Sequence, residues 1–85
     1  MKKVYVVWNE YSIWGVYENI TSAVKGMFKE LADNDYIWYY NEDDIEDAIT
    51  EAKKRIEAHY AHAYVWEDAD DPFLRVIITE TILQS

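Results

Sequence analysis

Carboxylates are the side chains in this sequence whose number and spacing could do chemistry. The chain holds 17 Asp and Glu against 8 Lys and Arg, which gives a formal net charge of −9. Eight carboxylates stand between residues 33 and 51 with no Lys or Arg among them, and a second group follows at residues 67–71. Such groups can form acid and base pairs, bind cations or present a negative surface to a partner.

Sequence motifs for catalysis are missing. With only Gly15 and Gly26, the chain has no glycine-rich phosphate loop, and without cysteine it has no disulfide, thiolate metal site or thiol nucleophile. A catalytic carboxylate pair needs a cleft with two different environments, for which 85 residues offer little room. We therefore expect a protein that is not an enzyme and that uses no cofactor.

Metal binding is not expected either. His59 and His62 stand three residues apart, but the sequence around them supplies neither an HExxH context nor a third ligand. We interpret His59 as a buried helix residue and His62 as a cation near a helix C-terminus. The DADDP segment, residues 68–72, lacks the alternating ligands and the distal Glu of a calcium-binding EF-hand loop.

The negative charge narrows the choice of partners. It repels nucleic-acid phosphates and anionic membranes, and it favours a basic protein. The longest apolar run is far below the roughly 18 residues of a membrane span. Because the N-terminal apolar run is too short and too aromatic for a signal peptide, we expect a cytoplasmic location. Residues 1–31 hold four Lys against three Glu, so the acidity is concentrated after residue 32.

Five segments have the composition of β-strands or of aromatic loops. Residues 3–9 and 13–18 are predicted to form a hairpin, and residues 3–9 are apolar on both faces, which favours a central place in the sheet. Gly15 is predicted to mark a bulge or a close contact. Residues 73–83 give the strongest strand signal, residues 63–67 a weaker one, and residues 36–40 fit either a strand or an aromatic loop.

Two segments have the apolar periodicity of helices. The first is predicted to be capped by Thr21 or Ser22 and to run to about residue 32, with Gly26 weakening it by about 1 kcal/mol. The second is predicted to be capped by Asn41 and to run from residue 42 to about residue 62. Its predicted buried stripe is Ile45, Ala48, Ile49, Ala52, Ile56, His59 and Ala63. Together the elements predict one α+β domain over residues 1–85, with a small antiparallel sheet of three to five strands and two helices on one face.

The second predicted helix turns its carboxylates away from its apolar stripe. Six charges fall within nine helical steps, or about one per 2.5 Å of axis, compared with about 1.7 Å for duplex DNA and about 3.4 Å for one strand. A rigid line of this density could occupy a groove built for phosphates. The candidate protein-binding residues are Glu42, Asp43, Asp44, Glu46, Asp47 and Glu51 on the helix and Glu67, Asp68, Asp70 and Asp71 after it. The alternative is a solvated face that serves solubility, with Arg55 four residues after Glu51.

Aromatic residues offer a second candidate surface. Four Trp and eight Tyr are many for one small core, and exposed aromatic anchors dominate protein interfaces. We expect Trp8 and Trp66 in the core, while Trp38, Tyr39 and Tyr40 fit either the core or an exposed patch.

In its acidic segments 33–51 and 67–71, and in its lack of cysteine and of a catalytic constellation, the chain resembles small acidic bacteriophage proteins that disable host or defence proteins. Among these are DNA mimics that block restriction enzymes, CRISPR effectors or the nucleoid protein HU. The resemblance is one of size and composition. It implies an inhibitor in the host cytoplasm that occupies the basic DNA-binding surface of a nucleoid protein of the HU type, a nuclease or a polymerase. The alternative is an interaction or assembly module, a homodimer included, that uses an aromatic patch or a sheet edge.

Overall fold

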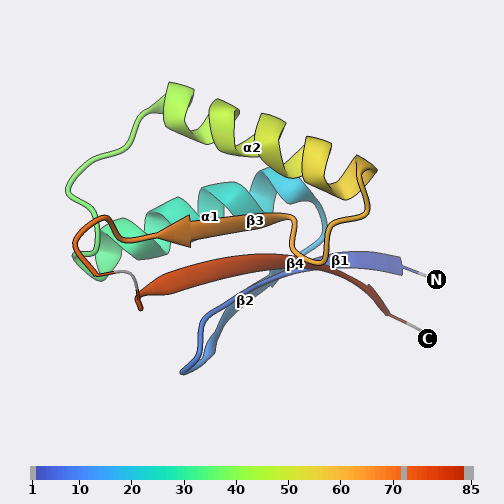
Figure 1. Cartoon of the computed structure of the whole chain (residues 1–85), viewed down its shortest axis with the longest axis horizontal. Coiled ribbons are helices and arrows are strands. Elements are labelled where there is room, and N and C mark those ends of the chain that lie inside the picture. The colour runs from blue at the N-terminus through green and yellow to red at the C-terminus, as the bar shows by residue number, and fades with distance from the viewer. Residues whose placement is uncertain (1, 72, 84–85) are drawn as a thin grey trace.

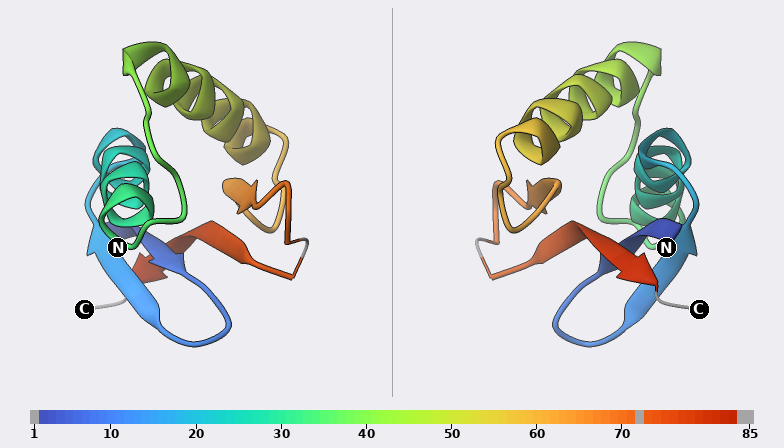
Figure 2. Two further views of the ribbon diagram at one scale, coloured as in Figure 1. Left: turned by 90° about the vertical axis from the view of Figure 1, so that its left-hand side faces the viewer. Right: turned by 90° about the vertical axis from the view of Figure 1, so that its right-hand side faces the viewer.

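Two helices lie over one face of an antiparallel sheet in the computed structural model, which describes residues 2–71 and 73–83 (Figures 1 and 2). The elements are β1 (Lys2–Trp8), β2 (Ile13–Tyr17), α1 (Ile20–Asp33), α2 (Glu42–Glu57), β3 (Tyr64–Glu67) and β4 (Arg75–Leu83). The sheet has four strands in the order β2-β1-β4-β3. The predicted α+β architecture is therefore confirmed, and residues 36–40 form a loop and not a strand. Within the described ranges, no helix is long and apolar enough to cross a membrane.

The first and last strands form the centre of the sheet. The β1–β4 register runs without interruption from Lys2 opposite Leu83 to Trp8 opposite Ile77. The short strands β2 and β3 lie at the two edges. The central position predicted for the first strand is thus confirmed. On the β2 side the register shifts between Val7 and Trp8, which makes Trp14 the extra residue of a bulge next to Gly15, as predicted.

The core lies between the helices and the sheet. The apolar stripe of α1 is buried as predicted. Helix α2 contributes a narrower stripe than predicted, because Ile45, Ala48 and Ala52 are buried while Ile49 and Ile56 are only partly buried. The buried residues of the core are Val7, Ile20, Ala23, Val24, Met27, Phe28, Leu31, Ile45, Ala48, Ala52, Ala63, Val76 and Ile78.

Asparagine side chains cap both helices. At α1 the cap is Asn19 and not Thr21 or Ser22, since the Asn19 side-chain oxygen accepts a hydrogen bond from the Ser22 backbone N–H at 2.8 Å. At α2 the predicted cap Asn41 is confirmed. It accepts from the backbone N–H of Asp44 at 2.9 Å, while the Asp44 carboxylate accepts from the backbone N–H of Asn41 at 3.0 Å. This reciprocal pair fixes the start of the acidic helix.

Helix α2 ends at Glu57, earlier than the sequence predicts. His59 takes the left-handed conformation with φ 59°, and the Tyr60 N–H donates to the Arg55 carbonyl at 3.0 Å. This is a Schellman ending, in which glycine usually holds the left-handed position. The expectation that His59 is a buried helix residue is wrong, because His59 is exposed beyond the helix end. Ala63 is buried but lies outside the helix.

Helix α1 ends in the same way, with Asp35 in the left-handed position at φ 62°. The Tyr36 N–H donates to the Leu31 carbonyl at 2.9 Å. Because histidine and aspartate replace glycine at these two ends, the usual sequence signal for a helix stop is missing at both.

The only two glycines of the chain both make room for Tyr17. A Cβ atom at Gly15 would lie 2.8 Å from the Tyr17 ring, and a Cβ atom at Gly26 would overlap the Tyr17 hydroxyl. The half-buried ring therefore lies against both backbones and brings α1 close to β2. The glycine that weakens α1 locally is thus required by tertiary packing.

Replacing Gly26 with alanine is expected to destabilise the fold. Helix propensity alone would favour alanine by about 1 kcal/mol, but overpacking against Tyr17 costs about 1–3 kcal/mol. We expect a lower midpoint in urea denaturation, and we expect Gly26→Ala to become neutral or stabilising when Tyr17→Leu removes the hydroxyl and ring edge. A rise in stability for Gly26→Ala in the native background would contradict this account.

Candidate functional site

The six carboxylates of α2 form an exposed surface, which is here named the acidic helix surface. Its residues are Glu42, Asp43, Asp44, Glu46, Asp47 and Glu51, and each is exposed. The opposite side of α2 carries the buried residues Ile45, Ala48 and Ala52. The predicted separation of charge from the apolar stripe is therefore present.

These carboxylates are not neutralised by ion pairs within the described part of the chain. The ion pairs found there are Lys2–Glu18 at 2.7 Å, Lys3–Glu80 at 3.9 Å and Lys29–Asp33 at 3.3 Å. The side chain of Arg55, four residues after Glu51, contacts other groups. Its Nε donates to the His62 carbonyl at 3.0 Å, and its guanidinium lies 4.8 Å from the Tyr60 ring centre. The negative field of α2 therefore reaches solvent largely uncompensated.

Three carboxylates of α2 line a groove against β3. Asp44, Asp47 and Glu51 face Tyr64 and Trp66 across a hollow of about 430 Å³. Burial raises the pKa of the Tyr64 phenol, and the negative charges of Glu51, Asp44 and Asp47 raise that pKa further. The groove therefore combines negative charge with aromatic walls, which suits a cationic side chain such as Lys or Arg.

The carboxylates at the end of β3 and in the loop that follows do not extend this groove. Glu67 stands directly opposite Arg75 in the sheet, and the alternation of side chains places it on the other face from Trp66. Asp68 and Asp71 accept hydrogen bonds from the backbone N–H groups of Asp70 and Phe73 at 2.9 and 3.1 Å. These bonds stabilise turns of the loop.

The β3–β4 loop lies at the same end of the molecule as the start of α2 but at the level of the sheet (Figure 1). The structure thus gathers the helix carboxylates and leaves Glu67, Asp68, Asp70 and Asp71 as a separate group. Pro72, the last residue of the DADDP segment, lies outside the described residues.

Some of the aromatic residues form an exposed pair beside α2. Trp38 is 100% exposed and Tyr39 is 75% exposed, in the loop that leads into Asn41 and the helix. Tyr40 packs on Phe28 with ring centres 5.5 Å apart. Of the two tryptophans expected in the core, Trp66 packs against it, while Trp8 lies on the other side of the sheet.

The face of the sheet turned away from the helices, here named the open face, is a surface that the sequence did not indicate. Strand alternation opposite the core residues Val7 and Ile78 defines it, and in Figure 2 no element of the described chain covers it. Its side chains are Val4, Val6, Trp8, Ile13, Val16, Val65, Ile77, Thr79, Thr81 and Leu83.

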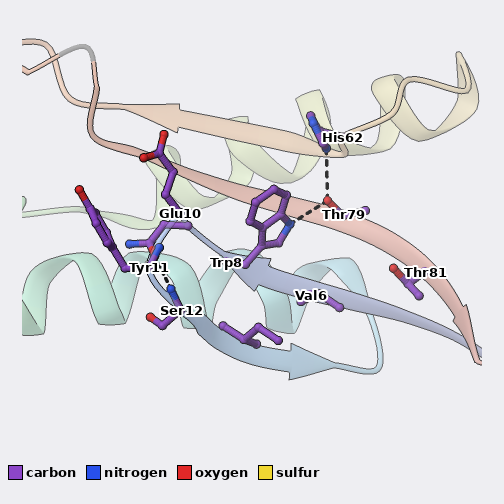
Figure 3. A pocket seen from close by; sticks show the side chains of 10 residues that line it. Val6, Trp8, Glu10, Tyr11, Ser12, His62, Thr79 and Thr81 are labelled. Carbon is purple, nitrogen blue, oxygen red and sulfur yellow. Dashed lines mark hydrogen bonds between the residues drawn. The ribbon is translucent and has the colours of Figure 1, made fainter.

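A hydrogen-bonded cluster holds Trp8 on this face (Figure 3). The Trp8 Nε1 donates to the Thr79 hydroxyl at 3.0 Å, and the His62 Nδ1 lies 3.2 Å from the same oxygen. The rings of Trp8 and His62 meet edge to face with centres 6.1 Å apart. His62 therefore lies on the sheet surface, five residues after the last residue of α2, and not near the helix C-terminus as the sequence suggested. The alternating valines and threonines of β1 and β4 were the signal that could have located this surface.

Within residues 2–71 and 73–83, no group of three or more His, Cys, Asp or Glu side chains could hold a metal ion. Comparison of the chain with protein families, curated proteins and solved structures finds no match. The function must therefore be inferred from the surfaces of this molecule alone.

Removing charge from the groove is expected to lower the pKa of Tyr64. With Asp47→Asn and Glu51→Gln together, the pKa should move toward its ordinary value of 10.0 and stay above it, because burial is the larger cause. A carbon-13 NMR titration of the tyrosine rings measures this shift. Glu46→Gln, outside the groove, is the control, and an equal shift in that variant would contradict the assignment.

The raised pKa also sets a direction for alkaline stability. The folded chain holds the Tyr64 proton to higher pH than the unfolded chain does. The contribution of Tyr64 to the free energy of unfolding is therefore fully present below about pH 10. It is lost as the pH rises through the pKa of Tyr64 in the folded chain.

Proposed function

We propose that this chain is a protein-binding inhibitor that mimics DNA and occupies the basic DNA-binding surface of a host protein. The partner class is a nucleoid protein of the HU type, a nuclease or a polymerase, and the place of action is the host cytoplasm. The observation that carries the proposal is the acidic helix surface, six exposed carboxylates on one rigid helix without an ion-pair partner in the described chain.

Rigidity is what distinguishes this surface from a charged tail. The capping box at Asn41 and the buried alanines of α2 hold the helix on the fold before a partner arrives. The carboxylates therefore lose little conformational freedom on binding. Their spacing of about 2.5 Å along the axis lies between that of one DNA strand and that of the duplex. A basic groove can then exchange phosphates for carboxylates at similar positions.

The proposed mechanism is competition. Lys and Arg side chains of the partner contact the acidic helix surface, and the DNA that they would otherwise hold is displaced. The groove beside Tyr64 and Trp66 offers a place where one cationic side chain meets both carboxylates and aromatic rings. Net charge of −9 on the whole chain speeds the encounter.

Neutralising three carboxylates of the acidic helix surface is expected to abolish most of the inhibition. Asp43→Asn, Asp47→Asn and Glu51→Gln together remove the charges at i, i+4 and i+8. Partners are captured from bacterial lysate on the immobilised chain, eluted by salt and purified. Displacement of a labelled DNA duplex from each is then followed by fluorescence anisotropy. The triple variant should need at least about tenfold more protein for half-displacement, which corresponds to about 1.4 kcal/mol.

A matched control separates position from net charge. Glu10→Gln, Glu30→Gln and Asp35→Asn remove the same number of charges outside α2, and we expect them to shift half-displacement by less than about threefold. Unfolding does not explain a loss in the test variant, because removing like charges at i, i+4 relieves repulsion in the helix. Equal effects of the two triple variants, or no displacement by the native chain, would refute the proposal.

Trp38 provides the test against an interaction module that uses aromatic residues. Its full exposure beside the start of α2 is the observation that favours this second candidate. Under the proposed function, Trp38→Ala should weaken binding less than the triple neutralisation does, and native affinity should fall at least about tenfold between about 50 and 200 mM salt. An affinity that does not change with salt concentration but is lost with Trp38→Ala would favour the aromatic interaction module instead.

A further inference from the structure

We propose that the open face of the sheet binds a second copy of this chain, so that two sheets pack face to face with both acidic helices outward. This inference is independent of the proposed function, since it uses none of the α2 carboxylates. An antiparallel sheet commonly leaves one face in solvent, and the side chains of that face are then polar. Here helices cover only one side of the sheet in the described chain (Figure 2), yet the central strands carry Val4, Val6 and Ile77 on the other side.

The composition of the open face is that of an interior. On the two central strands Val4 and Ile77 are only 4% and 9% exposed, while Ile13, Val16 and Leu83 on the same face are 69%, 58% and 49% exposed. From strand spacing and rise, two central strands of seven paired residues and two edge strands of four give a footprint of about 350 Å². That lies within the range of the largest apolar patch on a typical monomer. Because this area is below the roughly 800 Å² per partner of a standard stable interface, we expect a weak dimer.

Charge selects a second copy as the occupant. The charges around the open face nearly balance, since Lys2 pairs with Glu18 at 2.7 Å and Arg75 stands opposite Glu67 in the sheet. Glu10, on the wall of the hollow beside this face, adds one negative charge. A basic partner is drawn to the six carboxylates of α2 and not to this face, and two chains of net charge −9 repel each other least where each presents little net charge.

This arrangement also keeps the acidic helices apart. With sheets about 10 Å apart and a helix layer about 10 Å thick on each outer side, the two α2 surfaces lie about 30 Å from one another. That is several Debye lengths at physiological salt.

The shape of the face is self-complementary. The β1–β2 hairpin projects on the side away from the helices (Figure 2), and it forms one wall of a hollow of about 520 Å³ (Figure 3). Tyr11 and Ile13 stand on that wall, while Val6, Thr79 and Thr81 line the floor. About a two-fold axis, the hairpin of each copy can enter the hollow of the other, which is the reciprocal contact of a symmetric dimer.

Sedimentation velocity of the full chain tests the proposal, from about 1 µM to about 1 mM. We expect a concentration-dependent mass that approaches twice 10.1 kDa. Dimerisation should strengthen as salt rises from about 0.05 to 0.5 M, because salt screens repulsion between the copies. Binding through the acidic helix surface has the opposite salt dependence, so failure of one proposal is distinguishable from failure of the other.

Matched variants locate the interface. Ile13→Glu places a charge on the open face, and Tyr39→Glu places the same charge at a similarly exposed site, 75% against 69%, on the loop before α2. Ile13→Glu should raise the dimer Kd at least about tenfold, while Tyr39→Glu should leave it within about twofold. If Ile13→Glu fails the circular-dichroism check for folding, Thr81→Glu on β4 takes its place. A monomer at every concentration, or equal effects of the open-face and control variants, would overturn the inference.

Discussion

The antiparallel pairing of the first and last strands is the constraint on which the rest of this structure depends. The β1–β4 register joins residues some 75 positions apart in a chain of 85. The strands β2 and β3 and the helix α1 attach directly to this central pair, and α2 packs on α1 and β3. The Tyr5 hydroxyl donates to Glu80 at 2.9 Å across the central pair, and the Trp8 Nε1 donates to Thr79 at 3.0 Å. Since loop-closure entropy opposes such distant pairing, the apolar side chains on both faces of the pair must supply the compensating burial.

The same pairing separates two kinds of surface. Helix α2 lies on the covered side with its carboxylates outward, and the neutral, apolar side chains of β1 and β4 remain on the other. A chain with net charge −9 thereby keeps a face with little net charge. The two proposals use these surfaces separately, one for a basic partner and one for a second copy. Together they describe a symmetric molecule that presents two acidic helices.

At three positions the tertiary packing overrides the local conformational preference of the residue. Gly26 lowers the helix propensity of α1, yet it gives Tyr17 the space to join α1 to the sheet. His59 and Asp35 take left-handed conformations that glycine usually adopts, because the chain must turn where the apolar stripes end. The end of α2 could not be predicted from composition for this reason, and with it the position of His62 was missed.

The sequence by itself determined the features that depend on near neighbours. Apolar periodicity predicted both helices, the buried stripe of α1 and part of that of α2. Asn41 and Asp44 predicted the start of α2, and the row of carboxylates predicted an exposed acidic surface. Tertiary structure alone decided which side of the sheet the helices cover, because both sides of β1 are apolar and alternation cannot tell them apart. It also separated Glu67 and the loop carboxylates from the groove beside Tyr64, and it moved Trp8 from the expected core to the open face. These outcomes depend on strand register between distant residues, which no local pattern encodes.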